Sequence, residues 1–290
     1  MGKYPKEGRR VKSLPPMSLV VPYIMKTRNT SLNYIRDTID IEKCEEYIRK
    51  KRKEGLTNFG MLHLILTVYA RTVSQRPAIN RFIRGQRVYT RDHIEVMMTI
   101  KKQMTLESED TCIKFYMTPG ALPEEVYHSF NKLIDENKVK TEQSNGETAF
   151  DKLLKLLAYI PGFILRGVVA LLRSMDYYGL LPRFLTHLSP FHASLAITSM
   201  GSLGIPPIFH HLYDFGNIPV FLAYGAKRKA YELDKNGEVM QKKYVDFTVV
   251  TDERICDGFY FASALKLMKS YFNNPDQLDT PPEQIIKDIR

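Results

Sequence analysis

Residues 247–275 read FTVVTDERICDGFYFASALKLMKSYFNNP and fall into three parts of different character. Apolar residues predominate up to Thr251 in a pattern typical of a half-buried strand. The next residues, DERICDG, are polar for the most part and end in a glycine, which favours a turn. From Gly258 onward apolar residues recur at helical spacing. The stretch therefore predicts a strand, a short turn and a helix in immediate succession.

The DERICDG turn resembles the signature of the chloramphenicol acetyltransferase and dihydrolipoyl acyltransferase superfamily. In that family a strand ends in Asp-His-Arg-x-x-Asp-Gly immediately before a helix. Four residues of the turn match this pattern: Asp252, Arg254, Asp257 and Gly258. Glu253 stands at the position of the histidine. The resemblance implies a two-layer α+β fold, in which helices cover a mixed sheet.

Two upstream segments carry the same resemblance in the same order. SLAITSMGSLGIPPIF at 194–209 is similar to the family's Thr-Ile-Ser-Asn-Leu-Gly strand and turn. PVFLAYGAKRK at 219–229 is similar to the strand that follows it. Asn236-Gly237 is the strongest hairpin signal in the chain and separates two further strand segments. Residues 31–100 carry a weaker similarity, so the resemblance covers most of the chain apart from its middle.

Residues 141–192 have no good counterpart in the family and are predicted to form a helical insertion. The insertion is apolar around most of its helical circumference, with Arg166 and Arg173 on one narrow stripe. Such a helix needs cover from protein, from a partner or from a membrane surface. We favour a packed helix that the rest of the chain buries over an in-plane membrane contact. The chain is thus predicted to be one acyltransferase-like domain over residues 1–290, with an N-terminal segment at 1–30.

The resemblance assigns roles to residues of two of these segments. In the family the motif histidine is a general base that deprotonates an alcohol or thiol for attack on an acyl thioester. A hydroxyl from the upstream strand stabilises the oxyanion, and the motif alignment gives this role to Thr198, with Ser199 beside it. The second aspartate of the motif, here Asp257, is held by an arginine in the family. Arg28 and Arg36 are the candidates for that arginine.

Glu253 is the departure from the family that bears most on function. Imidazole suits a general base because its pKa lies near neutrality, whereas an unperturbed glutamate has a pKa of ~4.3 and must be buried to become one. Three hypotheses follow: Glu253 is a retuned base in a dry site, His210 or His211 supplies the base, or the site is catalytically silent. His192 is a weaker candidate, and His63 lies on an apolar helix and is expected in the core.

The resemblance implies a homotrimer in which the active-site channel forms between subunits, near the HHLYDFG segment. It also implies acyl transfer from acyl-coenzyme A, or from another thioester carrier, to an acceptor that the sequence does not identify. The alternative function is a catalytically silent trimer that binds an acyl ligand or a partner protein through the same channel. Glu253 favours this alternative, whereas Thr198, Asp257 and Gly258 favour the transferase.

Composition argues against several other classes of protein. Only three cysteines occur, widely spaced, so we expect a reduced, cytoplasmic location and no metal site of paired cysteines. No apolar run is long enough for a membrane-spanning helix. The net charge of +10 suits nucleic acid, an anionic surface or a polyphosphate cofactor. No nucleic-acid-binding signature accompanies that charge, so no nucleic acid partner is expected.

Overall fold

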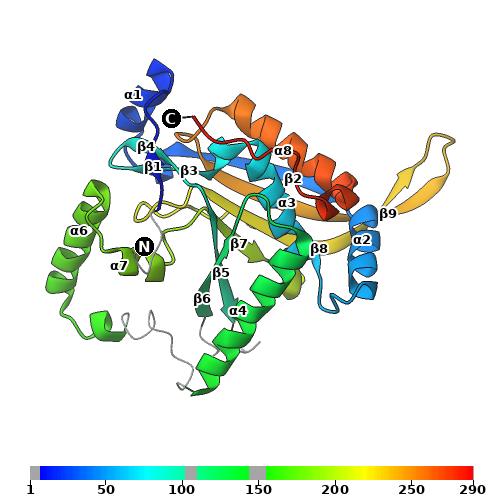
Figure 1. Cartoon of the computed structure of the whole chain (residues 1–290), viewed down its shortest axis with the longest axis horizontal. Helices are drawn as coiled ribbons and strands as arrows, with labels where there is room; N and C mark the ends of the chain where they lie inside the picture. Colours follow the sequence, from blue (N-terminus) through cyan, green and yellow to red (C-terminus); the bar gives the residue numbers. More distant parts are fainter. Residues whose placement is uncertain (1–6, 102–109, 144–154, 290) are drawn as a thin grey trace.

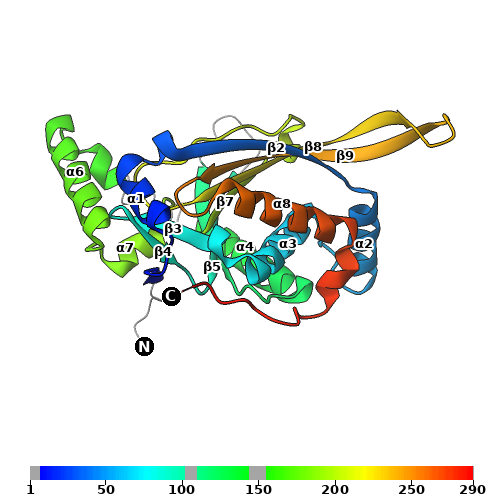
Figure 2. The same ribbon diagram turned by 90° about the horizontal axis from the view of Figure 1, so that it is seen from above.

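The computed structural model describes residues 7–101, 110–143 and 155–289. In these residues a mixed six-stranded sheet is covered by helices on one face, which is the α+β architecture that the sequence predicts (Figures 1 and 2). Within the same residues no helix is both long and apolar enough to cross a membrane, and no cluster of side chains has the make-up of a metal site.

The sheet has parallel pairs at its centre and antiparallel pairs on either side. Its strands, in spatial order, are β2 (Leu32–Asp40), β9 (Val239–Asp252), β8 (Val220–Leu233), β7 (Leu195–Ser199), β5 (Ile94–Lys101) and β6 (Asp110–Met117). Strand β7 runs parallel to both β5 and β8, whereas the other neighbours are antiparallel. The strand predicted before the DERICDG turn is β9, and it lies between β2 and β8.

Four helices form the layer that covers one face of the sheet, as Figure 2 shows. They are α2 (Glu42–Lys53), α3 (Met61–Gln75), α4 (Pro123–Gln143) and α8 (Gly258–Asn273). Helix α3 is the most deeply buried of them, because protein covers its side chains on every side from His63 to Ser74. The helix expected after Gly258 is confirmed as α8.

The remaining elements gather at one end of the sheet. A small sheet contains β1 (Arg9–Arg10), β4 (Arg87–Thr90) and β3 (Arg81–Arg84), and beside it lie α1 (Pro16–Ile24), α6 (Gly162–Tyr178) and α7 (Arg183–Leu188). At the opposite end β8 and β9 continue beyond the sheet as a two-stranded ribbon (Figure 1). The ribbon turns at Asn236-Gly237, where Gly237 has a φ of +82°, so the predicted hairpin is confirmed.

Two clusters of buried side chains lie on opposite faces of the sheet. The larger cluster fills the space between the sheet and the helices and includes Leu64, Tyr69, Ile197 and Leu222. The smaller cluster lies on the other face, where Ala196 packs with side chains such as Leu212 and Val250. No helix of the four covers this second face; the segment 200–219 crosses it instead. Because strand side chains alternate, Ala196 and Thr198 share this face, which we call the open face.

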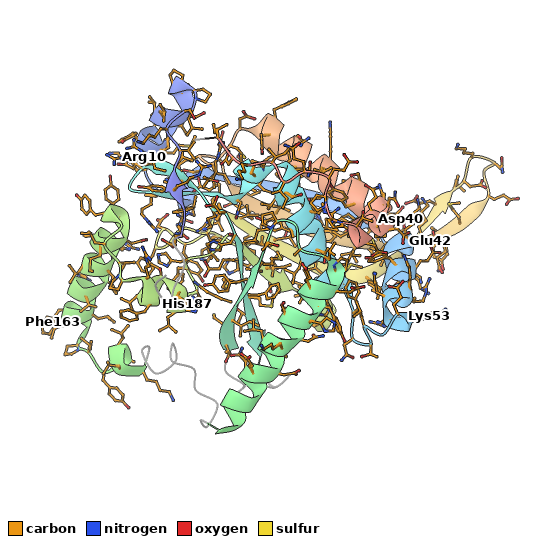
Figure 3. The ribbon with its side chains drawn as sticks, in the orientation of Figure 1. Arg10, Asp40, Glu42, Lys53, Phe163 and His187 are labelled. Atoms are coloured by element: carbon orange, nitrogen blue, oxygen red, sulfur yellow. The ribbon has the colours of Figure 1, made fainter. Side chains whose placement is uncertain are left out.

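The insertion does not pack as predicted. Only Asp176 of helix α6 is buried, whereas Phe163 is 79% exposed, Leu171 61% and Tyr178 72%. Figure 3 places Phe163 at the outer margin of the molecule. The prediction of a buried helix is therefore wrong for this chain, because α6 is apolar on two sides and the chain covers only one of them. Residues 144–154, which belong to the predicted insertion, lie outside the described residues.

Candidate functional site

The DERICDG turn connects the end of β9 directly to the start of α8. Asp257 is the N-cap of α8, and its carboxylate accepts a hydrogen bond from the Tyr260 amide at 2.8 Å. A carboxylate at this position satisfies a free backbone N–H group and interacts favourably with the helix dipole. The predicted pairing of Asp257 with Arg28 is wrong, because Arg28 pairs with Asp252. Within the described residues no ion pair of Asp257 is found, with Arg36 or any other cation.

Asp252 holds the turn in place through two buried arginines. Its carboxylate accepts hydrogen bonds from Arg254 Nε at 2.8 Å and Nη2 at 2.7 Å, and Arg28 Nε lies 3.4 Å away. Arg28 also donates to the carbonyls of Tyr213 at 2.5 Å and Gly216 at 2.9 Å. Burial lowers the pKa of Arg28, and Asp252 opposes that shift. This network ties the turn to the segment 200–219 and to the loop before β2.

Glu253 points away from this network. Its backbone amide donates to the Ser31 carbonyl at 2.8 Å, but its side chain is exposed. In the part of the chain that the structure describes, its carboxylate has no hydrogen bond or ion pair, and the neighbouring Arg254 is engaged with Asp252. A carboxylate base needs a desolvated setting. One chain alone does not provide that setting for Glu253.

Thr198 lies on the open face, and Ser199 lies on the opposite face. Thr198 pairs with Ala223 on β8, and Ala223 pairs in turn with Thr248 on β9. Ser199 faces the helix layer and hydrogen-bonds to the hydroxyl of Tyr224. It also lines a cavity of about 610 Å³ between the strand ends and the start of α3.

Thr198 and Glu253 are far apart within one chain. Thr198 is level with Thr248, which lies five residues before Glu253 along β9, and two strand spacings separate β7 from β9. At about 3.4 Å per residue and about 4.8 Å per strand spacing, the two residues are roughly 20 Å apart. The fold therefore does not bring together the two residues that the resemblance places in one site.

His210 lies on the same face as Thr198. Its ring stacks on Phe221 with centroids 4.3 Å apart, and its Nδ1–H donates to the His211 carbonyl at 2.7 Å. Phe221 pairs with Ala196, two residues before Thr198. His210 is half-buried and His211 is exposed. The chain thus places His210 on the face of the sheet that carries Thr198.

His63 is a core residue, as expected. Its ring packs between Phe59, Tyr127 and Phe130, with centroid distances of 5.2–5.3 Å, and its Nδ1 accepts a hydrogen bond from the Gly60 amide. This hydrogen bond satisfies a free N–H group at the start of α3.

His192 belongs to a buried network that sequence reasoning did not find. Its Nε2 lies 3.1 Å from Asp176 Oδ1, its Nδ1 lies 2.9 Å from Ser189 Oγ, and Asp176 also accepts from the Gly216 amide. Burial lowers the pKa of His192, so its ring is neutral near pH 7. Burial alone raises the pKa of Asp176, but the hydrogen bond from His192 reverses that effect. Asp176 is the single acid of an otherwise apolar helix, and that signal predicts a paired, buried carboxylate.

Comparison with known proteins supports the fold at low sequence identity. No family model and no curated protein sequence matches the chain. Among solved structures, the dihydrolipoamide acetyltransferase of Azotobacter vinelandii matches 92% of this chain and 93% of its own length with a TM-score of 0.56 and 10% identity. A probable dihydrolipoamide acetyltransferase from Listeria monocytogenes matches 95% of this chain and 98% of its own, with a TM-score of 0.55 and 12% identity.

A third structure is the truncated catalytic core of the 2-oxoacid dehydrogenase multienzyme complex from Thermoplasma acidophilum. It matches 92% of this chain and 99% of its own, with a TM-score of 0.52 and 11% identity. The protein therefore has an acyltransferase-type fold, that of dihydrolipoyl acyltransferase catalytic domains, and the predicted fold class is confirmed. At this level of identity the likeness extends to the fold and not to the reaction.

Proposed function

We propose that the chain forms a homotrimer and transfers an acyl group from a thioester at a site between neighbouring subunits. In this proposal Glu253 of one subunit meets Thr198 of the next. The observation that carries it is the separation of these two residues within one chain by roughly 20 Å, since each faces outward on a fold whose strands match an acyltransferase.

The open face supports an interface between subunits. Three exposed apolar side chains lie there: Tyr34 on β2, and Ile208 and Phe209 in the segment that crosses this face. Tyr34 and Phe209 contact each other edge to face, with ring centroids 5.8 Å apart. Contiguous apolar surface of this kind marks sites of protein association. The Thermoplasma acidophilum structure is the catalytic core of a multienzyme complex, so a chain of this fold occurs in an assembly.

The chemistry assigned to this interface is acyl transfer. An acceptor hydroxyl or thiol attacks the thioester carbonyl while Glu253 takes its proton, and the Thr198 hydroxyl donates a hydrogen bond to the oxyanion. Collapse of the tetrahedral intermediate breaks the carbon–sulfur bond, and the thiolate leaves and takes up the proton. The neighbouring subunit excludes water from Glu253, which supplies the desolvation that a carboxylate base requires.

The Azotobacter enzyme gives this assignment a second line of support. Its structure was determined to examine the roles of a serine, a histidine and an asparagine in catalysis, and the histidine and asparagine are four positions apart. Glu253 and Asp257 have the same spacing here. Asp257 is fixed by the helix cap, so it keeps one end of the turn rigid whatever residue acts as the base.

Coenzyme A is the first thioester carrier to test, although the cavity beside Ser199 fits only part of that molecule. Its volume of about 610 Å³ accommodates a slender, uncharged arm. The cation at its rim is Lys227, whose ammonium already pairs with Glu45 at 2.6 Å. The described lining thus fits the arm of a thioester better than a polyphosphate head, and carriers without that head belong in the same panel.

A second function is favoured by the exposure of Glu253. A trimer that binds an acyl ligand without transferring it needs no base, and the single chain does not desolvate this carboxylate. His210, the alternative base, has its Nδ1 engaged by a backbone carbonyl, which leaves only Nε2 for proton transfer.

Mixed trimers of two inactive variants test the proposed site. Glu253→Gln removes the base at constant size and Thr198→Val removes the hydroxyl, so each variant alone is expected to release little free thiol from acyl-coenzyme A. Random co-assembly restores an intact pair at about a quarter of the interfaces, and activity should recover to about that fraction of wild type. Full activity of either single variant, or no recovery on mixing, refutes the shared site.

One further variant distinguishes the transferase from the silent trimer. If wild type releases no thiol with any donor and Glu253→His does, the fold is competent and the natural chain is a binding protein. If wild type is active and Glu253→Gln is fully active as well, His210→Gln becomes the test of the base.

A further inference from the structure

Two cavities lie side by side beneath helix α6; the second of them also reaches Arg254 of the DERICDG turn. The first encloses about 300 Å³ between α6, α7 and the loop before β7. Its walls are almost wholly apolar and include Leu157, Val169, Leu172, Leu185, Phe191 and Phe215. A cavity of this size lies at the lower end of the range for small-molecule sites, about 300–1,000 Å³.

Two of the polar side chains that border this apolar cavity, Ser189 and His192, are engaged in hydrogen bonds. Ser189 Oγ and Asp176 Oδ1 hydrogen-bond to the two nitrogens of His192, at 2.9 Å and 3.1 Å. Asp176 Oδ2 accepts from the Gly216 amide. An ordered water needs two to four polar partners, and this wall offers few. The cavity therefore suits an apolar occupant better than water.

The second cavity encloses about 250 Å³ and is rich in cations. Five basic side chains and two carboxylates line it: Lys26, Arg28, Arg84, Arg173, Arg254, Asp176 and Asp214. Three of the arginines already have acidic partners, since Arg28 and Arg254 share Asp252 and Arg84 pairs with Glu7. Lys26 and Arg173 have no ion pair within the residues that the structure describes.

The acids of the second cavity do not neutralise those two cations. Asp176 is bound to His192, and Asp214 accepts a hydrogen bond from the Asn29 amide at 3.0 Å. Burial lowers the pKa of Arg84 as well as that of Arg28, which indicates guanidinium groups short of water. An anion placed between Lys26 and Arg173 would meet two cations that have no ion pair within the described residues.

Arg173 and Phe215 line both cavities, so the two spaces meet at these side chains. We propose that the pair of cavities binds one anionic amphiphile. Its acyl or alkyl chain occupies the apolar cavity, and its negatively charged head lies between Arg173 and Lys26. This inference goes beyond the proposed function, because neither cavity is lined by Glu253 or Thr198.

The ligand has two possible sources, a free fatty acid or a membrane lipid. The outer side of α6 bears on this choice, because Leu171 and Tyr178 are exposed there and do not line the cavity, whereas Leu172 and the partly exposed Val169 do. A free ligand needs only the cavity side of the helix. Contact with a lipid surface needs the outer side.

Calorimetric titration of the full chain with dodecanoate, below its micelle concentration, tests the proposal. We expect saturable binding at one site per chain, and weaker binding of dodecanol by about tenfold because it lacks the charge. Val169→Trp fills the apolar cavity and should abolish binding, whereas Leu171→Trp makes the same change on the outer side and should not. Arg173→Glu should weaken binding about tenfold, and Arg166→Glu, two turns away, should leave it unchanged.

Several outcomes overturn the proposal. Equal binding by Val169→Trp and Leu171→Trp excludes the cavity, and equal affinity for dodecanoate and dodecanol excludes the cationic head site. Binding only to anionic vesicles, lost in Leu171→Asp and kept in Val169→Trp, shows a membrane contact instead. Dodecanoate is not a thioester, so its binding is measured independently of acyl transfer. Failure of thiol release with intact dodecanoate binding counts against the proposed function alone.

Discussion

Removing the Asp252 carboxylate should destabilise the fold more than any other single change in the DERICDG turn. Asp252 is fully buried, and Arg28 and Arg254 are 4% and 5% exposed. In Asp252→Ala both guanidinium groups remain in place without their shared carboxylate. Arg254 keeps its hydrogen bond to the Met25 carbonyl, and Arg28 keeps those to Tyr213 and Gly216. The charge of each is then uncompensated.

The expected cost follows from the surroundings of the two arginines. Breaking a buried ion pair by removing one partner costs about 3–5 kcal/mol. Both arginines line the cationic cavity of about 250 Å³, so water can reach them after the change. The loss in the free energy of unfolding should therefore lie near the lower end of this range, at about 3 kcal/mol. For a chain of this size that corresponds to a fall in Tm of roughly 6–12 °C.

Urea unfolding at one fixed protein concentration measures this effect. The midpoint should fall with an unchanged m-value, because the change acts on stability and not on the exposed area. Glu253→Ala is the matched control one position away, and its exposed side chain should leave the midpoint essentially unchanged. Combining Asp252→Ala with Arg28→Met should recover part of the loss. A loss below about 1 kcal/mol for Asp252→Ala refutes the view that this carboxylate holds the turn.

Three further predictions concern Gly216, acid stability and assembly. Gly216→Ala should lower the thermal midpoint strongly, because Gly216 has a φ of +86° and an added Cβ would collide with the Phe191 carbonyl; Gly237→Ala, at a φ of +82° with open space around it, should cost much less. Stability should fall from pH 7 to pH 5, because burial holds the pKa of His192 below 6.5 and the unfolded chain binds the extra proton; urea melts of His192→Asn should show a smaller fall. Light scattering at micromolar concentration should give a trimer, and a strict monomer would remove the shared site.

The elements around the DERICDG turn were predictable because their signals are local. The alternating pattern before Asp252, the N-cap Asp257 and the helical spacing after Gly258 each depend on a few neighbouring residues. The same holds for the Asn236-Gly237 hairpin. The order of the motifs along the chain then predicted the fold class. A family resemblance specifies how the strands are ordered in the sheet, and no local pattern contains that information.

Contacts between distant segments were not predictable in the same way. The sequence offered Arg28 and Arg36 as partners of Asp257, and only the fold shows that Arg28 lies beside Asp252 instead. The prediction that α6 is buried failed for a related reason. An apolar helix must be covered by something, but its sequence does not say whether the same chain supplies the cover. Asp176 was missed because its partner, His192, lies 16 residues away on a loop.

Because of the position of Glu253, the proposed catalysis depends on assembly of the subunits. A carboxylate that stays exposed is a poor base, and Thr198 lies roughly 20 Å away across two strands, so one subunit lacks both a desolvated base and a nearby oxyanion donor. In the proposed trimer a neighbouring subunit supplies both, so any condition that dissociates the subunits should abolish the proposed acyl transfer. Ligand binding at the site beneath α6 should not depend on assembly. Val169, Arg173 and Phe215 come from one chain, so amphiphile binding should persist in a dissociated subunit whose transferase activity is lost.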